Sequence, residues 1–256
     1  RVDVAAHQVR RVPPGWSFAE GAGFLVQGLS VYYGLVSLGA ARRGQVCLVH
    51  SAAGGCGLLA LAICSKLGVR VVGTVGSEAK VEAILSRFPE LDRGQIIVRE
   101  RDRFGEQLDA ALGVVEAKAF DIVLDAIQGD FFWPAFERIR PGGRHVCYGA
   151  ADLTPSGDRL GPLGFGALGW KYLRRPRVDP MDMMQRNVAL MCFNLIWMFG
   201  EVDQLSRDIG ELLALDLDPP RVGMEIPFEE APRALRLFQS GRTTGKVVLT
   251  LSLIHI

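Results

Sequence analysis

The stretch Val46-Cys47-Leu48-Val49-His50-Ser51-Ala52-Ala53-Gly54-Gly55-Cys56-Gly57 joins a short apolar run to a glycine-rich turn. A helical pattern from Leu58 to Leu67 follows it directly. This order of strand, turn and helix is typical of the first unit of a nucleotide-binding βαβ fold. Aligned with G-x-G-x-x-G, the turn reads Ala52-x-Gly54-x-x-Gly57, so alanine replaces the first glycine.

The two remaining glycines of the turn suit contact with a pyrophosphate. Gly54 has no Cβ and would let the backbone approach the phosphates, while Gly57 would let the helix pack closely on the strand. The start of the helix then presents free N–H groups and a partial positive charge to an anion. A degenerate glycine motif is weak evidence for nucleotide binding by itself, so the segments that follow it must support that interpretation.

Strands and helices alternate after this turn. Extended segments are predicted at Arg70–Val75, Gln95–Val98, Phe120–Asp125, Arg144–Gly149 and Val188–Leu195, with helical patterns between them. Strands separated by helices of this length run parallel. We therefore predict an α/β fold with a Rossmann-type doubly wound parallel sheet. The segment Leu153–Pro180 is expected to be an irregular loop, and Val9–Val12 the end of a strand.

The residues after the second strand bear on the choice of nucleotide. NAD-specific proteins usually carry an acid here for the ribose, but Gly73–Ser77 contains none. Ser77 and Lys80 stand about 20 residues beyond Gly57 and suit a 2′-phosphate, which favours NADP. Arg99, directly after the third strand, could reach the same phosphate with its planar fork. The alternative is an ordinary N-cap serine and a solvated lysine.

Composition narrows the class of protein. The chain has 256 residues, 49% hydrophobic and 22% charged, with a net charge of +1, which suits a folded domain and gives no reason to expect nucleic acid. The five cysteines are dispersed, without a C-x-x-C pair, which indicates free thiols in a reducing, cytoplasmic compartment and no metal site. The longest apolar run, Val188–Phe199, is too short for a transmembrane segment.

The ends of the chain are expected to be incomplete or foreign. Arg1 is not an initiator, and the segment from Arg221 no longer continues the βα alternation. It reads as a strand to Ile226, a helix over Phe228–Gln239 and a strand over Lys246–Leu251. We expect a fragment whose tail at 252–256 is not native.

Several motifs in a fixed order resemble a known family. Phe24–Leu35, the turn Ala52-Ala53-Gly54-Gly55-x-Gly57, Gly73-Thr74-Val75-Gly76-Ser77-x-x-Lys80 and Thr244-Gly245-Lys246-Val247-Val248-Leu249 are similar to the zinc-independent quinone oxidoreductases. These belong to the medium-chain dehydrogenase/reductase superfamily, with zeta-crystallin and polyketide enoyl reductases as relatives. Tyr148–Leu153 and Cys192–Leu195 most resemble the vesicle amine transport protein homologues within it.

The resemblance implies two domains and a metal-free reaction. Residues 1–20 would end a GroES-like domain that is mostly missing, 21–220 would form the NADPH-binding Rossmann domain, and 221–251 would return to the first domain. It also implies hydride transfer from NADPH to a quinone or an α,β-unsaturated carbonyl. A homodimer through the sixth strand would be the usual assembly.

The resemblance also implies the residues that contact NADPH. Ala53, Gly54, Gly55 and Gly57 would hold the pyrophosphate, and Gly73, Ser77, Lys80 and Arg99 would surround the 2′-phosphate, with Arg242 added to them; Ser30, Tyr148, Phe193 and Asn194 would lie toward the nicotinamide. Arg99 replaces the tyrosine usual in the family, which keeps a phosphate donor and loses aromatic stacking. From the residues alone, Ser30 could equally cap and pack, together with Gln27 and Tyr33 on one helix face.

The sequence identifies no catalytic residue. The four histidines, at positions 7, 50, 145 and 255, form no visible constellation, and no proton donor stands out. Cys56 at the helix start is interpreted as a buried structural thiol rather than a reactive one. The competing hypothesis is a non-catalytic protein that binds NADPH and has a membrane- or partner-associated role.

Overall fold

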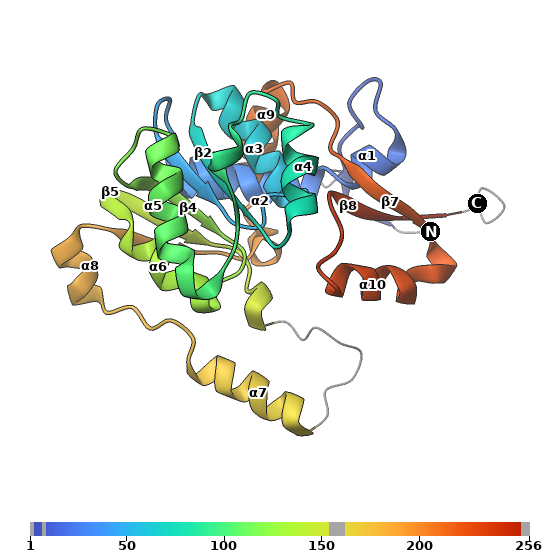
Figure 1. Cartoon of the computed structure of the whole chain (residues 1–256). Helices are drawn as coiled ribbons and strands as arrows, with labels where there is room; N and C mark the ends of the chain where they lie inside the picture. Colours follow the sequence, from blue (N-terminus) through green and yellow to red (C-terminus); the bar gives the residue numbers. More distant parts are fainter. Residues whose placement is uncertain (1–2, 7–8, 154–161, 252–256) are drawn as a thin grey trace.

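A computed structural model describes residues 3–6, 9–153 and 162–251 (Figure 1). Its centre is a six-stranded parallel sheet of order β3-β2-β1-β4-β5-β6. The strands are β1 (Val46–Val49), β2 (Arg70–Val75), β3 (Ile96–Val98), β4 (Phe120–Asp125), β5 (Ile139–Cys147) and β6 (Ala189–Cys192). The order reverses between β1 and β4, where doubly wound sheets bind nucleotides, and the predicted fold class is confirmed.

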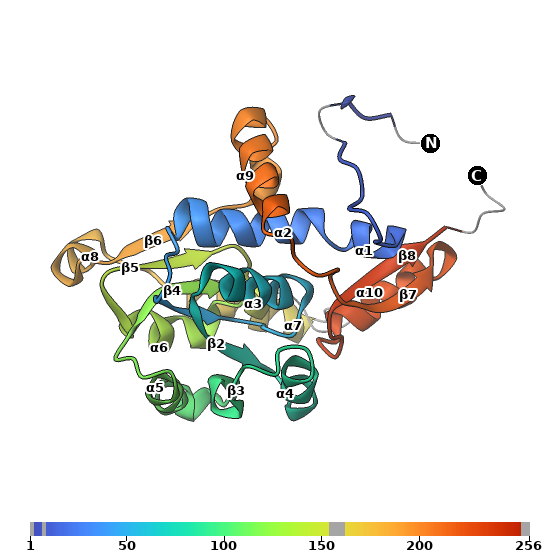
Figure 2. The same cartoon turned by 90° about the horizontal axis from the view of Figure 1, so that it is seen from above.

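Helices cover both faces of this sheet, as Figure 2 shows from above. One core lies under α2 and α3 and includes Val49 and Leu124, while the other lies under α5 and α6 and includes Leu48 and Val123. The alternate residues of each buried strand thus point to opposite cores. The helices are α1 (Phe18–Ala22), α2 (Leu25–Tyr32), α3 (Gly55–Leu67), α4 (Glu78–Leu85), α5 (Phe104–Val114), α6 (Phe132–Glu137), α7 (Pro162–Leu173), α8 (Pro180–Arg186), α9 (Val202–Ala214) and α10 (Ala231–Gln239).

Shorter helical turns connect these elements. A π-helix, η2 (Tyr33–Leu38), continues α2, so the helical segment that begins at Leu25 widens in its second half. The 3₁₀ turns are η3 (Arg93–Gln95), η4 (Arg101–Arg103), η5 (Gly129–Phe131), η6 (Ala151–Leu153), η7 (Leu195–Met198) and η8 (Phe228–Glu230). A capping box of Ser17 and Glu20 begins α1.

Four predictions of local structure were wrong in detail. Val9–Val12 forms no strand, and the expected loop at Leu153–Pro180 contains helix α7, which Figure 1 shows set apart from the sheet. The sixth strand ends at Cys192 because Asn194 caps η7 with its side chain. The fifth strand begins at Ile139, before the Pro-Gly-Gly turn, with a register irregularity opposite Phe120 and Ile122.

The segment from Arg221 forms a separate unit beside the sheet. Strands β7 (Val222–Pro227) and β8 (Lys246–Thr250) pair in parallel with each other, and α10 connects them. Gly245 N donates to Ala53 O at 2.9 Å, so this unit is hydrogen-bonded to the glycine turn. The tail expected to be non-native lies outside the described residues.

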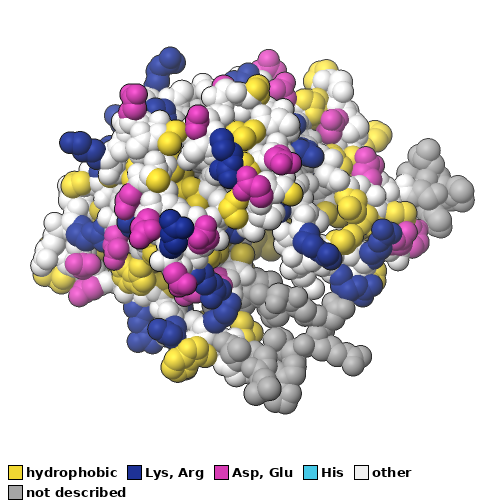
Figure 3. Space-filling model, viewed as in Figure 1, with side chains coloured by type: hydrophobic (Ala, Val, Ile, Leu, Met, Phe, Trp, Pro, Cys, Tyr) yellow, Lys and Arg dark blue, Asp and Glu magenta, His cyan; other side chains and the backbone are white. Residues whose placement is uncertain are grey.

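Two surface features complete the description. On the face drawn in Figure 3, basic and acidic side chains are interspersed, in keeping with the net charge of +1. Across the part of the chain that the structure describes, no helix is both long and apolar enough to cross a membrane.

Candidate functional site

The glycine turn brings β1 and α3 into close contact. A Cβ on Gly57 would lie 2.3 Å from Ser51 O and 2.5 Å from Ala52 Cα, so only glycine fits without moving the backbone. Gly54 occupies the N-cap position of α3 in an extended conformation, and no side chain caps the helix. The first N–H groups of α3 therefore point to a region where an anion would satisfy them.

Two cations meet at the carboxyl ends of β2 and β3. Arg99 Nη1 donates to Thr74 Oγ1 at 3.0 Å, and its guanidinium lies 5.3 Å from the centre of the Phe131 ring. Lys80 Nζ donates to Gly241 O at 2.6 Å. Burial lowers the pKa of Arg99 to about 10 despite the nearby Asp125, and burial followed by the Arg99 charge lowers the pKa of Lys80.

Neither cation has an ion-pair partner within the described ranges, although both are partly buried. Ser77 takes the N-cap position of α4, yet its hydroxyl makes no capping hydrogen bond. We call Ser77, Lys80 and Arg99 the basic end of the site. Its two cations, which lack ion-pair partners in the described residues, and a hydroxyl that makes no capping hydrogen bond are suited to a phosphate group.

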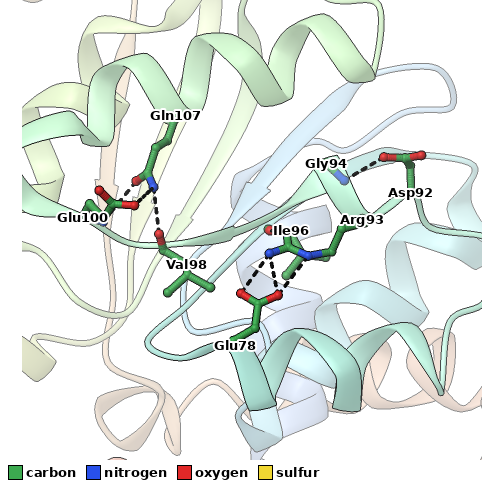
Figure 4. A network of polar contacts seen from close by, with 8 residues as sticks. All are labelled: Glu78, Asp92, Arg93, Gly94, Ile96, Val98, Glu100 and Gln107. Atoms are coloured by element: carbon green, nitrogen blue, oxygen red, sulfur yellow. Dashed lines mark hydrogen bonds and ion pairs between the residues drawn. The ribbon is translucent and has the colours of Figure 1, made fainter.

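A polar network holds the basic end in place (Figure 4). Gln107 Nε2 donates to Val98 O at 2.9 Å, and Glu100 N donates to Gln107 Oε1 at 3.1 Å. Gln107 is thus hydrogen-bonded to the residues on both sides of Arg99, Val98 and Glu100. This role was not predicted, because the only signal in the sequence is an amide one turn into the helix that follows the strand.

The first acidic residue after β2, Glu78, forms an ion pair with Arg93. Glu78 begins α4, and both of its carboxylate oxygens accept from Arg93 Nη2, at 2.7 and 2.9 Å (Figure 4). Arg93 also donates to Ile96 O at 2.7 Å, which fixes its position. The Glu78 carboxylate is therefore paired with Arg93 of η3, and it forms no ion pair with Lys80 or Arg99 in the described residues.

A buried polar layer lies beneath the basic end. His50 Nδ1 and Thr74 Oγ1 are 3.0 Å apart, and His145 Nε2 lies 3.0 Å from Asp125 Oδ2. Burial lowers the pKa of His50 to about 4, with Asp125 opposing the shift. The structure thus brings two histidines to Asp125, a constellation that was not predicted from the sequence.

Asp125 stays ionised in this layer. Burial by itself would raise the pKa of its carboxyl, but the hydrogen bond to His145, the two histidine rings and the Gln128 N–H together lower it well below the usual range. Its Oδ1 accepts from the backbone N–H groups of Ile127 and Gln128 at 2.7 and 2.8 Å. The carboxylate therefore acts as an anchor for the chain after β4.

Asp125, His145 and Cys147 form a group with metal-ligand chemistry, their ligand atoms within 4.8 Å of one another. The group does not fit a catalytic zinc centre. The imidazole and the carboxylate already bond each other directly, and the thiol is hydrogen-bonded to Cys192. All three residues are at most 4% exposed, which leaves no open position for a substrate or water.

Aromatic rings gather at the other end of the carboxyl edge. The rings of Tyr148 and Phe193 are stacked at 6.1 Å and 19°, and Tyr33 meets Phe193 edge to face at 5.0 Å. We call these three residues the aromatic end. The Tyr148 hydroxyl is buried without a hydrogen-bond partner in the described structure, and burial followed by the nearby Cys56 raises its pKa well above the usual value.

The remaining predicted residues take varied positions. Ser30 Oγ donates to Val26 O at 2.7 Å within α2, and Asn194 Oδ1 accepts from Ile196 N at 3.3 Å. Gly73 is buried inside β2, where a Cβ would lie 3.0 Å from the Ala52 Cβ, so it serves packing under the turn. Arg242 is exposed and bonds Ser240, next to the Gly241 that receives Lys80.

Lys246 is a second residue of the site that was not predicted from the sequence. A Cβ on Gly55 would lie 3.4 Å from its Cδ, so this cation lies against the glycine turn. A cavity of about 380 Å³ opens here, lined by Gly54, Gly55, Lys246 and apolar residues of α10. Burial raises the pKa of the neighbouring Cys56 thiol to about 11, with Lys246 opposing, which fits a structural thiol.

Comparison with known proteins gives this arrangement a family. The synaptic vesicle membrane protein VAT-1 homolog of Rattus norvegicus is 30% identical over 252 residues, which cover 97% of this chain and 59% of that protein. The highly reducing polyketide synthase easB of Emericella nidulans is 30% identical over 243 residues, 93% of this chain and 9% of the synthase. The chain thus spans about six tenths of the first relative and less than a tenth of the second.

A solved structure and a family model agree with these relatives. The quinone oxidoreductase of Thermus thermophilus, solved also in complex with NADPH, is 26% identical and superposes with a TM-score of 0.67 over 94% of this chain and 69% of that one. Residues 95–249 match the model of the zinc-binding dehydrogenases. The chain therefore belongs to the zinc-binding dehydrogenase family of the medium-chain dehydrogenases/reductases, among whose members are the quinone oxidoreductases and enoyl reductases.

Proposed function

We propose that this chain binds NADPH along the carboxyl edge of its sheet and forms the cofactor domain of a metal-independent oxidoreductase. The substrate class is a quinone or an α,β-unsaturated carbonyl. Bound NADPH would supply the hydride. Support comes from the family membership and from the donor groups that line this edge.

The observation that carries the proposal is the pair Arg99 and Lys80. The Arg99 guanidinium raises the cost of charging Lys80, and neither cation has a carboxylate within ion-pair distance in the described residues. A 2′-phosphate between them would relieve this repulsion and accept the Ser77 hydroxyl as well. An unphosphorylated ribose would leave the charge in place, since Glu78 is held by Arg93.

The other residues would divide the cofactor between them. The backbone at Ala53, Gly54, Gly55 and Gly57 would bind the pyrophosphate, with the α3 N-terminus and Lys246 adding positive charge. Arg242 would border the 2′-phosphate. At the opposite end, the stacked rings of Tyr148 and Phe193 would border the nicotinamide, flanked by Ser30 and Asn194.

The wall that receives the substrate is proposed to lie outside residues 21–220. We propose that 1–20 and 221–251 belong to a GroES-like domain, because β7 and β8 form a sheet of their own and the relatives are longer than this chain. That domain would shield the reacting atoms from water. A donor for the substrate oxygen would then stabilise the developing negative charge.

The cofactor proposal is tested by titrating the chain with NADPH and NADH. Lys80→Ala is expected to weaken NADPH about tenfold and Arg99→Ala about a hundredfold, with NADH changed little, because each charge-assisted bond to phosphate is worth about 1.5 to 3 kcal/mol. Arg103→Ala is the matched control, since Arg103 lies in the same loop and bonds only surface acids. Equal losses for both nucleotides would refute the 2′-phosphate assignment.

The reaction is tested with the full-length protein. NADPH oxidation is followed with 9,10-phenanthrenequinone and with an enone, in buffer containing a zinc chelator. Turnover that survives the chelator supports the proposal. Tight NADPH binding without turnover of either acceptor would favour the alternative of a non-catalytic NADPH-binding protein, in keeping with the resemblance to a synaptic vesicle membrane protein.

We also propose a homodimer through β6. This strand lies at the edge of the sheet, where its backbone groups are open to pairing with a second copy. Light scattering of the full-length protein is expected to give twice the chain mass. A monomer would overturn this assembly.

A further inference from the structure

Two cysteines face each other at the carboxyl ends of β5 and β6. Cys147 and Cys192 are register partners in this parallel pair, so their side chains leave the sheet on the same face. Neighbouring strands lie about 4.8 Å apart, within the Cα separation of about 4.4 to 6.8 Å that a disulfide spans. The two thiols are neighbours, and each shifts the pKa of the other.

The two thiols differ in exposure and in acidity. Cys147 is 4% exposed, whereas Cys192 is open to solvent. The hydrogen bond from Cys147 lowers the pKa of Cys192 to about 7, and the same bond together with burial raises the pKa of Cys147 well above its usual value. Near neutral pH the exposed sulfur is thus about half thiolate, and its buried neighbour is a thiol.

A second pair in the chain shows what is special about this one. Cys47 on β1 and Cys64 on α3 are also neighbouring thiols, but both are 0% exposed, and the Cys47 thiol donates to Leu48 O at 3.6 Å. Burial raises the pKa of Cys47 well above its usual value. An oxidant in solution therefore meets no accessible sulfur at that pair.

We propose that Cys192 and Cys147 form a modification site at which hydrogen peroxide is reduced and a reversible disulfide is made. The Cys192 thiolate attacks one oxygen of the peroxide, the O–O bond breaks, and a sulfenic acid and hydroxide result. The Cys147 sulfur then attacks the Cys192 sulfur, the S–O bond breaks, and water leaves with the Cys147 proton. In sum, two thiols and one peroxide give one disulfide and two waters.

The disulfide would act on the aromatic end of the site. Tyr148 and Phe193 directly follow the two cysteines, and their stacked rings depend on how β5 and β6 are spaced. A bridge would fix that spacing and tie the edge strand to the sheet. Only this consequence rests on the proposed NADPH binding; the thiol chemistry does not.

The experiment treats the folded chain with hydrogen peroxide and measures its intact mass before any alkylation. A second portion is unfolded, its remaining thiols are blocked with iodoacetamide, and its tryptic map is measured. We expect a loss of two hydrogen atoms and one cross-linked peptide pair, residues 145–159 joined to 187–207. Cys47, Cys56 and Cys64 are expected to remain reduced. Dithiothreitol is expected to restore the original mass.

Variants separate the two roles. Cys192→Ser is expected to abolish the cross-link, and Cys147→Ser to leave a sulfenic acid on Cys192 that dimedone traps. In Cys147→Ala, which removes the neighbouring thiol and supplies no hydroxyl in its place, alkylation of Cys192 should also slow about threefold at neutral pH. Cys47→Ser is the matched control and should form the bridge at the unchanged rate.

Three results would overturn the proposal. The first is separate alkylation of Cys147 and Cys192 after peroxide treatment of a folded chain. The second is a cross-link between the Cys192 residues of two chains. The third is equal oxidation of the Cys47–Cys64 pair, which would mean that exposure and hydrogen bonding do not select the site.

Discussion

The basic end and the aromatic end lie on the same carboxyl edge but are held by different forces. Arg99 is positioned by its hydrogen bond to Thr74 and by the Gln107 grip on its neighbours, above a buried polar layer. Phe193 is positioned by ring contacts with Tyr33 and Tyr148, above an apolar core that includes Val146. Hydrogen bonds fix direction and discriminate charge, whereas ring packing fixes distance and tolerates different ligands.

We expect the basic end to determine the selectivity for NADPH over NADH, and the aromatic end to contribute to the affinity for both nucleotides. Only the basic end faces the atoms that distinguish NADPH from NADH in the proposed complex, and the aromatic end faces a ring that both share. Changes at the first end should therefore alter the ratio of the two affinities. Changes at the second should lower both together.

The largest effect on binding is expected at the glycine turn between β1 and α3, which lies between the basic end and the aromatic end. Gly57→Val forces a side chain against Ser51 O and Ala52 Cα, so the free energy of unfolding should fall by about 3 kcal/mol or more and binding of both nucleotides should be lost. Urea denaturation measures the first and titration the second. Gly113→Ala is the control, because nothing lies within 4 Å of its Cβ position, and it should stabilise by about 0.5 to 1 kcal/mol.

Lowering the pH should destabilise the fold first through His50, in the polar layer beneath the basic end. Unfolded histidine takes up a proton near pH 6.5, while folded His50 resists protonation until about pH 4. The unfolded state therefore binds more protons between these values, and the free energy of unfolding should fall by about 3 kcal/mol as the pH drops from 6.5 to 4. Stability is measured by urea denaturation at each pH.

His50→Asn keeps a polar group beside Thr74 and removes the titrating ring. Its free energy of unfolding should change much less over the same range of pH. Asp125 contributes separately and at lower pH, because its pKa is depressed and its contribution disappears only as the carboxylate is protonated. An equal slope in wild type and His50→Asn would contradict the assignment to His50.

Removing the Gln107 hydrogen bonds that flank Arg99 should alter the selectivity for NADPH over NADH, although Gln107 itself is not proposed to contact the nucleotide. Gln107→Leu loses the hydrogen bonds to Val98 and Glu100, so NADPH affinity should fall about tenfold and NADH affinity little, a change of about 1.4 kcal/mol. The ratio of the two dissociation constants is the measurement. Gln185→Leu, at an exposed position on α8, should leave it unchanged.

The smallest effect is expected at the aromatic end. Phe193→Ala removes the stacking partner of Tyr148 and should weaken NADPH and NADH equally, about fivefold, since an aromatic pair is worth about 0.5 to 1.5 kcal/mol. Phe199→Ala, at an exposed position after η7, is the control. A selective loss of NADPH in Phe193→Ala would break the division between the two ends.

Much of the candidate site follows from local patterns in the sequence. The glycine turn, the alternation of strands and helices, and the absence of an acid at Gly73–Ser77 place Ser77, Lys80 and Arg99 at one edge, because parallel strands end on the same side of a sheet. Helix α7 was missed because its glycines and prolines resemble a loop. Glu78, although next to Ser77, was not expected to be held by Arg93, which is 15 residues away.

The sequence by itself determined the alternation of strands and helices, the turn that needs glycine, and the chemical types gathered at the edge of the sheet. Periodicity and steric limits at single positions suffice for these. Only the tertiary structure decided that Gln107 grips the neighbours of Arg99, that His145 bonds Asp125, that Lys246 lies on the glycine turn and that Cys192 meets Cys147. Such pairs depend on strand register and helix packing, which join residues distant in the chain and leave no local pattern.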